Sequence, residues 1–467
     1  MNQERLHHFV TNIWQQSIIP ELSEFIKIPC KSVDYDKNWE ENGLLMKAAE
    51  HMMQWAKQHN IPGIEIDLLQ DKGRTPLLYI EIPGEIDATT VLYGHLDKMP
   101  ENTGWSDGLE PWKPVLRDGK LYGRGSADDG YSFYASLAAI LALRDQGLPH
   151  PRCVLLIEGA EESGSIDFPY YLEKLADRIG EPELVVCLDS GCGNYDQLWC
   201  TSSLRGVAAV TLEISSVTQG LHSGDAGGIV PATFRMLRIL LDRIENMHTG
   251  EILLDSANVE IPGVRQEQAK AMADVLGDEL YKSFPFVPGC KAVSDDNTEL
   301  LLNRTWRPAL VVTGADYLPE ICDAGNVLRA KTKVKLSMRL PPKADPSAVV
   351  ADMKRVLEQD PPYNAKIVVN KADTIQGWDA PETAPWLEEA LHESSNVYFG
   401  KDPIYMGEGG SIGFIQLLND KFPKAQFLIT GVLGPHSNAH GPNEFLHLDA
   451  AQKLTSCVAH VLNAQNK

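Results

Sequence analysis

The sequence predicts an α/β protein with a mostly parallel sheet flanked by helices and an inserted ferredoxin-like α+β segment. In the first half of the chain, short apolar runs typical of buried strands alternate with helical patterns, as in a parallel sheet. A second series of strand and helix patterns follows, before helix and strand patterns return near the C-terminus. We therefore expect one domain made of residues 1–204 and 379–467, interrupted by an inserted domain of residues 205–378.

Three predicted strands of the first domain end at clusters of polar residues. The strands cover residues 89–93, 153–157 and 184–188, and helices are expected at 131–143 and 168–179. In parallel sheets, ligands bind beyond the carboxyl ends of the strands, which is where these polar clusters fall. The sequence therefore predicts a functional site at this edge of the sheet.

The inserted domain has a β-α-β-α-β pattern. Strands are expected at 207–214, 334–340 and 366–369, with helices at 231–244 and after Asp345-Pro346, where an N-cap residue precedes a proline. This order suggests a ferredoxin-like unit. Its size suits a lid over a catalytic domain.

Composition excludes several classes of function. Lys plus Arg number 42 and Asp plus Glu number 64, so the net charge of −22 disfavours nucleic acids and acidic membrane surfaces as partners. No apolar run reaches the length of a membrane helix, and the first residues predict an amphipathic helix rather than a signal peptide. Eight cysteines without a Cys-x-x-Cys pair, in 467 residues, fit a reducing cytoplasm.

The first polar cluster contains His95 and Asp97. Residues i and i+2 at a strand end point to the same side, so Asp97 can accept the second ring N–H of His95 and orient the imidazole as a metal ligand. By itself, a His-x-Asp pair also fits an ordinary surface pair.

Two further clusters add carboxylates. The glycine-rich run 123–130 lacks the lysine of a phosphate loop, and it forms either a solvated turn or a tight turn that directs Asp128 to a metal. Glu161 and Glu162 follow the second strand. If extended, they point to opposite sides, so that one binds metal while the other handles protons; a helix N-terminus is the alternative interpretation.

Combined, these clusters provide nitrogen and oxygen ligands without thiolates. Such a set fits zinc, manganese or cobalt, with zinc as the default. Five ligands suffice for two metal ions if one carboxylate bridges them. The proposed ligands are His95, Asp128, Glu162, Asp189 and His440.

The ordered set of motifs resembles one family. The motifs are Gly94-His95-Leu96-Asp97, Gly123-Arg124-Gly125 to Asp128, Glu161-Glu162-Ser163-Gly164, Asp189, Leu221-His222-Ser223-Gly224 and His440-Gly441-Pro442-Asn443-Glu444. In this order they resemble the dinuclear-zinc metallopeptidases, which include carnosine dipeptidases, bacterial dipeptidases, aminoacylases and succinyl-diaminopimelate desuccinylases. The long insert is most similar to the dipeptidase branch.

The resemblance implies a role for each metal-site residue. His95 and Asp189 would bind one ion, Glu162 and His440 the other, and Asp128 would bridge the two. Glu161 would be the general base, and Asp97 would orient His95. The implied reaction is hydrolysis of the amide bond of dipeptides, or of N-acyl amino acids, that carry a free carboxylate.

The resemblance also implies roles for residues of the inserted domain. His222 would reach the active site of the partner in a homodimer and stabilise the oxyanion. The substrate carboxylate would be bound by Arg339, by the backbone of Gly409, Gly410 and Ser411, and by Asn326.

Two departures and two alternatives remain. Many relatives have Asp-x-Lys-Gly where this chain has Asp128-Asp129-Gly130-Tyr131, and Gly441 stands where a serine often follows the metal histidine. The run 409–413 also matches the Gly-x-Ser-x-Gly elbow of serine hydrolases, with Asp420 and His436 or His440 downstream. The other alternative is a metal-binding protein without turnover.

Overall fold

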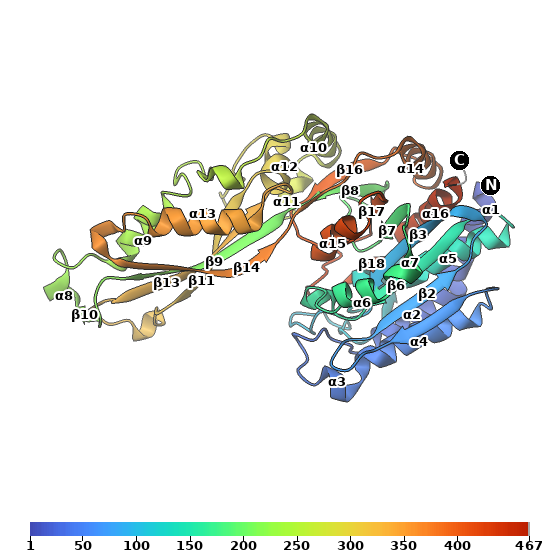
Figure 1. Ribbon diagram of the computed structural model, residues 1–467, viewed down its shortest axis with the longest axis horizontal. Helices are drawn as coiled ribbons and strands as arrows, with labels where there is room; N and C mark the ends of the chain where they lie inside the picture. Colours follow the sequence, from blue (N-terminus) through green and yellow to red (C-terminus); the bar gives the residue numbers. More distant parts are fainter. Residues whose placement is uncertain (466–467) are drawn as a thin grey trace. The chain divides into compact units, whose positions relative to one another are not determined.

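The computed structural model describes residues 1–465, which form two compact units (Figure 1). Unit 1 comprises Met1–Ser202, Ala380–Met406 and the residues from Leu417 on, and unit 2 comprises Ser203–Asp379 and Gly407–Gln416. The sequence-based division assigns all of 379–467 to the first domain, whereas residues 407–416 belong to unit 2. One reason is that the backbone N–H of Arg205 donates to the carbonyl of Gly410, 3.0 Å away.

Unit 1 contains a six-stranded sheet. β3 runs parallel to both β6 and β7, and β17 runs parallel to β7, whereas β1 and β2 are antiparallel additions at one edge. The mostly parallel sheet and its three predicted strands, β3, β6 and β7, are therefore confirmed. The order is β1 (Glu65–Leu69), β2 (Leu77–Ile82), β6 (Pro151–Glu158), β3 (Ile86–His95), β7 (Leu184–Cys187), β17 (Gln426–Ile429).

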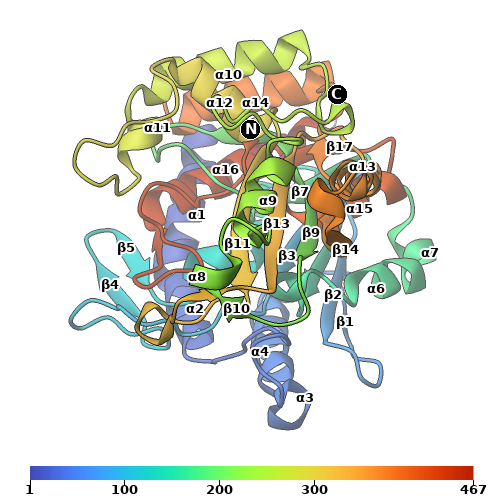
Figure 2. The same cartoon turned by 90° about the vertical axis from the view of Figure 1, so that its left-hand side faces the viewer.

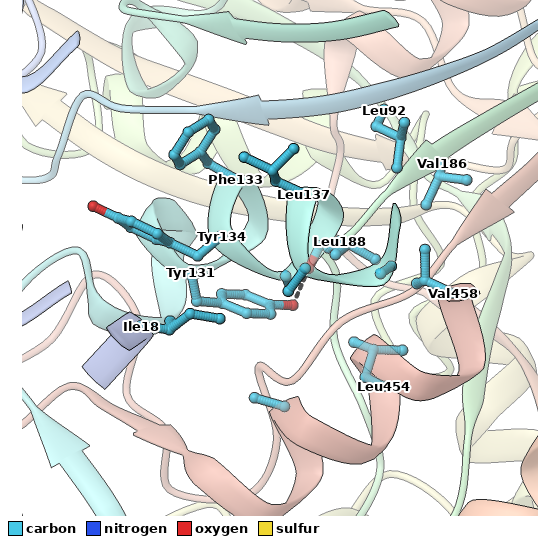
Figure 3. Close-up of a cluster of buried hydrophobic side chains, with 14 of the residues drawn as sticks. Ile18, Leu92, Tyr131, Phe133, Tyr134, Leu137, Val186, Leu188, Leu454 and Val458 are labelled. Atoms are coloured by element: carbon cyan, nitrogen blue, oxygen red, sulfur yellow. Dashed lines mark hydrogen bonds between the residues drawn. The ribbon is translucent and has the colours of Figure 1, made fainter. Parts of the chain in front are cut away.

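The central helix of unit 1 is α5 (Tyr131–Asp145), which is buried on nearly all sides. It packs against α16 (Leu448–Ala464) and β3. Figure 3 shows the Tyr131 hydroxyl donating a hydrogen bond to the carbonyl of Leu188, at the end of β7. This hydrogen bond links the first residue of α5 to the residue that follows β7.

The N-terminal helices cover the same core. The predicted amphipathic helix is α1 (Gln3–Ile13), which buries Leu6 and Val10, followed by a π-helical turn, α2 (Ile19–Ile26), α3 (Trp39–Asn42) and α4 (Leu44–Gln58).

Between residues 1 and 465, no helix combines the length and apolarity needed to cross a membrane.

One helix boundary differs from the prediction. Residues 168–179 form two helices, α6 (Phe168–Lys174) and α7 (Ala176–Ile179). They are separated at Leu175, whose φ of −99° and ψ of 4° depart from helical geometry.

The remaining strands and helices form a small sheet and the segments that connect the two units. A small antiparallel sheet has the order β18 (Phe445–His447), β5 (Lys120–Tyr122), β4 (Val115–Arg117). The chain passes between units along β8 (Trp199–Leu204) and β16 (Ile404–Glu408), which form a sheet with β15 (Trp378–Asp379). Along the chain, α14 (Pro385–Tyr398) precedes β16 and α15 (Gly413–Lys421) follows it.

Unit 2 is built on a four-stranded antiparallel sheet, and it contains the three strands that the sequence predicts for a ferredoxin-like unit. The order is β14 (Lys366–Ile375), β9 (Gly206–Ser215), β13 (Lys331–Leu340), β11 (Ala309–Asp316). Helices α9 (Thr233–Leu241) and α13 (Pro346–Glu358) share a hydrophobic core with one face of this sheet. The side chain of Asp345 accepts hydrogen bonds from two backbone N–H groups of α13, as expected of an N-cap.

Unit 2 also contains elements that the sequence did not reveal. The edge strand β11 lies between β13 and solvent, and six of its eight residues are exposed. Between α9 and β11 the chain forms α10 (Gly263–Leu276), α11 (Glu279–Lys282) and α12 (Asn297–Thr305). A two-residue ladder of β10 (Leu221–His222) and β12 (Val327–Leu328) adjoins α8 (Ser223–Ala226) (Figures 1 and 2).

Candidate metal and substrate sites

The carboxyl ends of β3 and β6 bring the predicted ligands of unit 1 together. β3 ends at His95, and the next residue, Leu96, donates its backbone N–H to the carbonyl of Glu158 at the end of β6, at 2.8 Å. Asp189 follows β7, the other neighbour of β3. Residues far apart in sequence therefore meet at one edge of the sheet, as the polar clusters predicted.

His95 is fully buried and faces three aspartates. Its Nε2 lies 3.2 Å from Oδ1 of Asp128 and 3.6 Å from Oδ2 of Asp189. Its Nδ1 lies 3.0 Å from the backbone carbonyl of Asp97 and 3.4 Å from its carboxylate. Asp97 therefore lies beside the second ring nitrogen of His95, with its backbone oxygen closer than its carboxylate.

Asp128 lies between two histidines. While Oδ1 faces His95, Oδ2 lies 3.1 Å from Nε2 of His440. The same nitrogen of His440 lies 3.1 Å from Oε2 of Glu162. Asp128 thus presents one oxygen to each histidine, as a carboxylate that bridges two cations must do.

The local geometry of Glu161 and Glu162 differs from the expectation. These residues begin a short 3₁₀ turn, Glu161–Ser163, instead of extending β6, so their side chains are not on opposite sides of a strand. The carboxylate of Asp97 accepts both of their backbone N–H groups, each at 3.1 Å. Asp97 therefore positions the two glutamates as well as His95.

Burial and crowding of like charges shift the pKa values in this cluster. Burial raises the pKa of Glu161 and Asp189 well above the usual range, and that of Glu162 to about 7. Hydrogen bonds with Asp128 and Glu162 raise the pKa of His440 to about 11. Because both kinds of shift oppose the accumulation of negative charge, the cluster favours a bound cation.

The donor set fits divalent metal ions. Within residues 1–465, ligand atoms of His95, Glu161 and Asp189 lie within 4.8 Å of one another, as do those of His95, Asp128 and Glu162. In addition, Oε1 of Glu162 is buried without a hydrogen-bond partner. Imidazole nitrogens and carboxylate oxygens without thiolates suit zinc, manganese or cobalt.

Glu444 organises the loop that carries Asp128, a role that the sequence did not reveal. Its buried carboxylate accepts the backbone N–H groups of Gly125, Ala127 and Asp128, at 3.1 to 3.2 Å. It also pairs at 2.7 Å with Arg124, which is 1% exposed. The pair fixes the glycine-rich run as a tight turn around the site.

Asp129 and Gly130 explain the first departure from the family pattern. Oδ2 of Asp129 accepts the backbone N–H of His95 at 3.1 Å, so this residue also supports the metal site. A Cβ atom at Gly130 would lie 2.4 Å from the Phe25 ring and 2.5 Å from the carbonyl of Gly125. No lysine can therefore occupy position 130 unless this packing changes.

The predicted carboxylate-binding residues other than Asn326 come together in unit 2. Nη1 of Arg339 donates to Oγ of Ser411 at 3.0 Å, and the Ser411 hydroxyl donates to the carbonyl of Arg205. Nε of Arg205 donates to the carbonyl of Gly409 at 3.1 Å. Arg205, which sequence reasoning did not select, thus fixes the loop of Gly409, Gly410 and Ser411 beside Arg339.

His222 and Asn326 lie together elsewhere in unit 2. His222 pairs with Val327 in the β10–β12 ladder, and the carbonyl of Asn326 accepts the backbone N–H of Ser223 at 2.9 Å. The side chain of His222 is 68% exposed. Asn326 therefore adjoins His222 within unit 2, on a surface open to solvent.

The contacts of Ser411 and His440 disfavour a serine hydrolase. The Ser411 hydroxyl donates to the backbone carbonyl of Arg205, so its proton is not directed at a histidine. His440 contacts Asp128 and Glu162. A nucleophilic serine needs a histidine base within hydrogen-bond distance.

Comparisons with known proteins show the family of this chain. The model of "Peptidase family M20/M25/M40" matches residues 91–464. A cysteinylglycine-S-conjugate dipeptidase from Corynebacterium striatum is 26% identical over 369 residues, which cover 77% of each chain. A Beta-Ala-His dipeptidase from Homo sapiens is 27% identical over 397 residues, which cover 81% of this chain and 76% of the relative.

Solved structures share the fold. Human carnosine dipeptidase 1 matches with a TM-score of 0.76 at 21% identity, covering 100% of this chain and 99% of the other. An M20 family metallo-carboxypeptidase from Sulfolobus solfataricus matches with a TM-score of 0.73 at 22% identity, covering 95% and 98%.

Proposed function

Because the chain belongs to peptidase family M20/M25/M40, we propose that it is a metal-dependent dipeptidase that cleaves dipeptides with a free carboxylate. One observation carries this proposal: Asp128 presents its two carboxylate oxygens to different histidines, in a buried cluster of further carboxylates. The relatives described above include dipeptidases that match about four fifths of this chain.

We infer two metal positions that share Asp128. His95 and Asp189 would hold one divalent ion, and His440 and Glu162 the other. Zinc is the first choice, and manganese and cobalt have compatible ligand preferences. When bound, two such ions polarise the carbonyl of the substrate and lower the pKa of water.

Glu161 is the proposed general base. It lies among the ligand atoms of His95 and Asp189, and Asp97 fixes its backbone N–H. It would accept a proton from the attacking water and transfer that proton to the departing amine nitrogen. Burial raises the pKa of its carboxyl, which makes the carboxylate a stronger base for the first of these steps.

Substitution of the two adjacent glutamates tests this assignment. Glu161→Gln should retain both metals and the fold but lose about 10²–10⁴ in kcat, the usual contribution of a general base. Glu162→Gln should instead weaken metal binding. Exposed Glu181→Gln is the matched control, because its partner Lys424 is also exposed. Near-normal turnover of Glu161→Gln on dipeptides would contradict the proposal.

We assign the substrate carboxylate to Arg339 and the backbone of Gly409, Gly410 and Ser411. Asn326 adjoins His222 instead, so it would contact the substrate together with His222. A dipeptide and an N-acyl amino acid both present an amide next to a carboxylate, so deacylation is the second candidate. A succinyl-diaminopimelate desuccinylase from Zymomonas mobilis is 25% identical over 49% of this chain. A mixed library of dipeptides and acyl-amino acids, with products identified by mass, separates the two activities and also tests for a protein without turnover.

We further propose a homodimer in which unit 2 is the lid and dimerisation domain and His222 acts in the partner's active site. His222 is exposed, and exposed apolar residues flank its elements in sequence: Ile229 is 82% and Ile321 is 93% exposed. In the proposed homodimer, these two side chains would lie in or beside the interface. The eight cysteines, all within the described residues, form no disulfide, which supports a reducing, cytoplasmic location.

A further inference from the structure

Unit 2 gathers three arginines around the loop of residues 409–411. Arg205 and Arg339 donate to Gly409 and Ser411 as described above. Arg304, near the end of α12, borders the same loop: a Cβ atom at Gly409 would lie 3.1 Å from Cγ of Arg304 and 3.3 Å from Nη2 of Arg205. Three arginine side chains therefore border one short glycine-containing segment.

These three arginines have no acidic partner. Among the described residues, no carboxylate lies within 4.0 Å of Arg205, Arg304 or Arg339, whereas Arg307, three residues after Arg304, pairs with Glu299 at 2.6 Å. Burial, followed by the charges of Arg339 and Arg304, lowers the pKa of Arg205 to about 10. The cluster therefore carries uncompensated positive charge.

The loop leaves room for a ligand. A Cβ atom at Gly410 would have no neighbour within 4 Å, so the space beside this residue is open. Helix α15 begins at Gly413, directly after the loop, and the partial positive charge of its N-terminus has the same sign as the arginines. Both features favour a negatively charged ligand.

The number of charges exceeds what one carboxylate needs. One bidentate arginine already neutralises the charge of a single carboxylate. Three arginines around one loop repel one another, and a ligand with two negative groups relieves that repulsion more than a ligand with one. A dipeptide with a neutral C-terminal residue supplies only its terminal carboxylate to such a cluster.

We propose, building on the proposed dipeptidase activity, that this arginine cluster selects dipeptides whose C-terminal residue is aspartate or glutamate. Arg339 and the loop would bind the terminal carboxylate, and Arg304 would bind the carboxylate of the C-terminal side chain. Arg205 positions the loop through its backbone and guanidinium hydrogen bonds. Arg304 is thus a specificity-determining residue.

Matched pairs of substrates test the proposal. For the metal-loaded enzyme, kcat/KM for Ala-Glu should exceed that for Ala-Gln by about 10- to 100-fold, the range expected for a hydrogen bond between charged groups. Arg304→Gln should bring this ratio close to one, chiefly through KM for Ala-Glu, and Arg304→Lys should restore part of it. Arg307→Gln is the control, and it should leave the ratio unchanged.

Two results would overturn the proposal: equal kcat/KM for Ala-Glu and Ala-Gln in the wild-type enzyme, or an unchanged ratio in Arg304→Gln. If no dipeptide is hydrolysed, the proposed function fails, and titration calorimetry with L-glutamate and L-glutamine still decides the anion site. Tighter binding of L-glutamate that Arg304→Gln abolishes would support the site, and equal binding of the two amino acids would refute it.

Discussion

The metal-ligand cluster of unit 1 and the exposed residues of unit 2 differ in how firmly the fold positions them. His95 is fully buried and its neighbours are fixed by backbone hydrogen bonds, for example from Glu161 and Glu162 to Asp97. The side chain of His222, in contrast, is 68% exposed. The difference indicates that substitutions of the metal ligands and their supporting residues in unit 1 should change metal affinity and stability, whereas those of His222 and Arg339 in unit 2 should change rate or KM alone.

Among substitutions in unit 2, the largest expected effect on rate is that of His222→Ala. A preorganised donor to a developing oxyanion contributes about 10²–10³ in rate. We therefore expect that loss of kcat, with unchanged metal content and thermal stability. His248→Ala is the matched control, since His248 is also an exposed histidine of unit 2.

Complementation then tests whether His222 acts in the partner subunit. Mixing His222→Ala with Glu161→Gln should restore up to about a quarter of wild-type activity, because random pairing gives half mixed dimers with one intact site each. No recovery in a preparation shown to exchange subunits would contradict action across the interface.

In unit 1, Glu444→Gln should instead lower the stability and the metal affinity of the protein. The substitution leaves the buried Arg124 without its charged partner and loosens the turn that carries Asp128. Loss of one partner of a buried pair costs about 3–5 kcal/mol, and loss of a residue that supports metal ligands costs about 10- to 100-fold in metal affinity. Denaturant unfolding and metal titration measure these two effects.

The double variant Arg124→Gln/Glu444→Gln sharpens this prediction. Because it removes the unpaired charge, it should be more stable than Glu444→Gln alone. Unchanged metal affinity in both variants would show that the turn does not depend on the pair.

The smallest expected effect is that of Arg339→Ala. Loss of a charge-assisted hydrogen bond to the substrate carboxylate should raise KM about tenfold or more, with kcat less affected. Lys335→Ala is the control, because Lys335 lies four residues earlier on the same strand and is exposed. An equal change of KM in the two variants would argue against a specific contact with Arg339.

The sequence predicted the central strands, and it selected residues that lie together at the ends of those strands, because their signals are local. β3, β6 and β7 are apolar runs that end at polar residues, and the parallel sheet brings those ends together. The antiparallel strands β1 and β2 and the edge strand β11 were not predicted. β11 begins with an apolar run, residues 309–312, that the sequence analysis did not assign to a strand, and its residues are mostly exposed because it lies at the edge of the sheet.

The residues that support the sites could not be predicted, since their roles depend on contacts between distant segments. Glu444 is 320 residues from Arg124, and Arg205 reaches a loop 204 residues away. The same holds for the assignment of residues 407–416 to unit 2. For Glu444 alone a signal existed, because it ends the motif that contains His440.

Metal analysis of Asp128→Ala tests the central claim most directly. The account predicts that wild-type protein reconstituted with zinc or manganese binds two ions per chain and that Asp128→Ala loses both, because each ion shares this carboxylate. Exposed Asp274→Ala, which disrupts only a surface pair with Lys270, should retain both ions. A wild-type protein that binds no metal after full reconstitution, or an Asp128→Ala variant that still binds two ions tightly, would contradict the account.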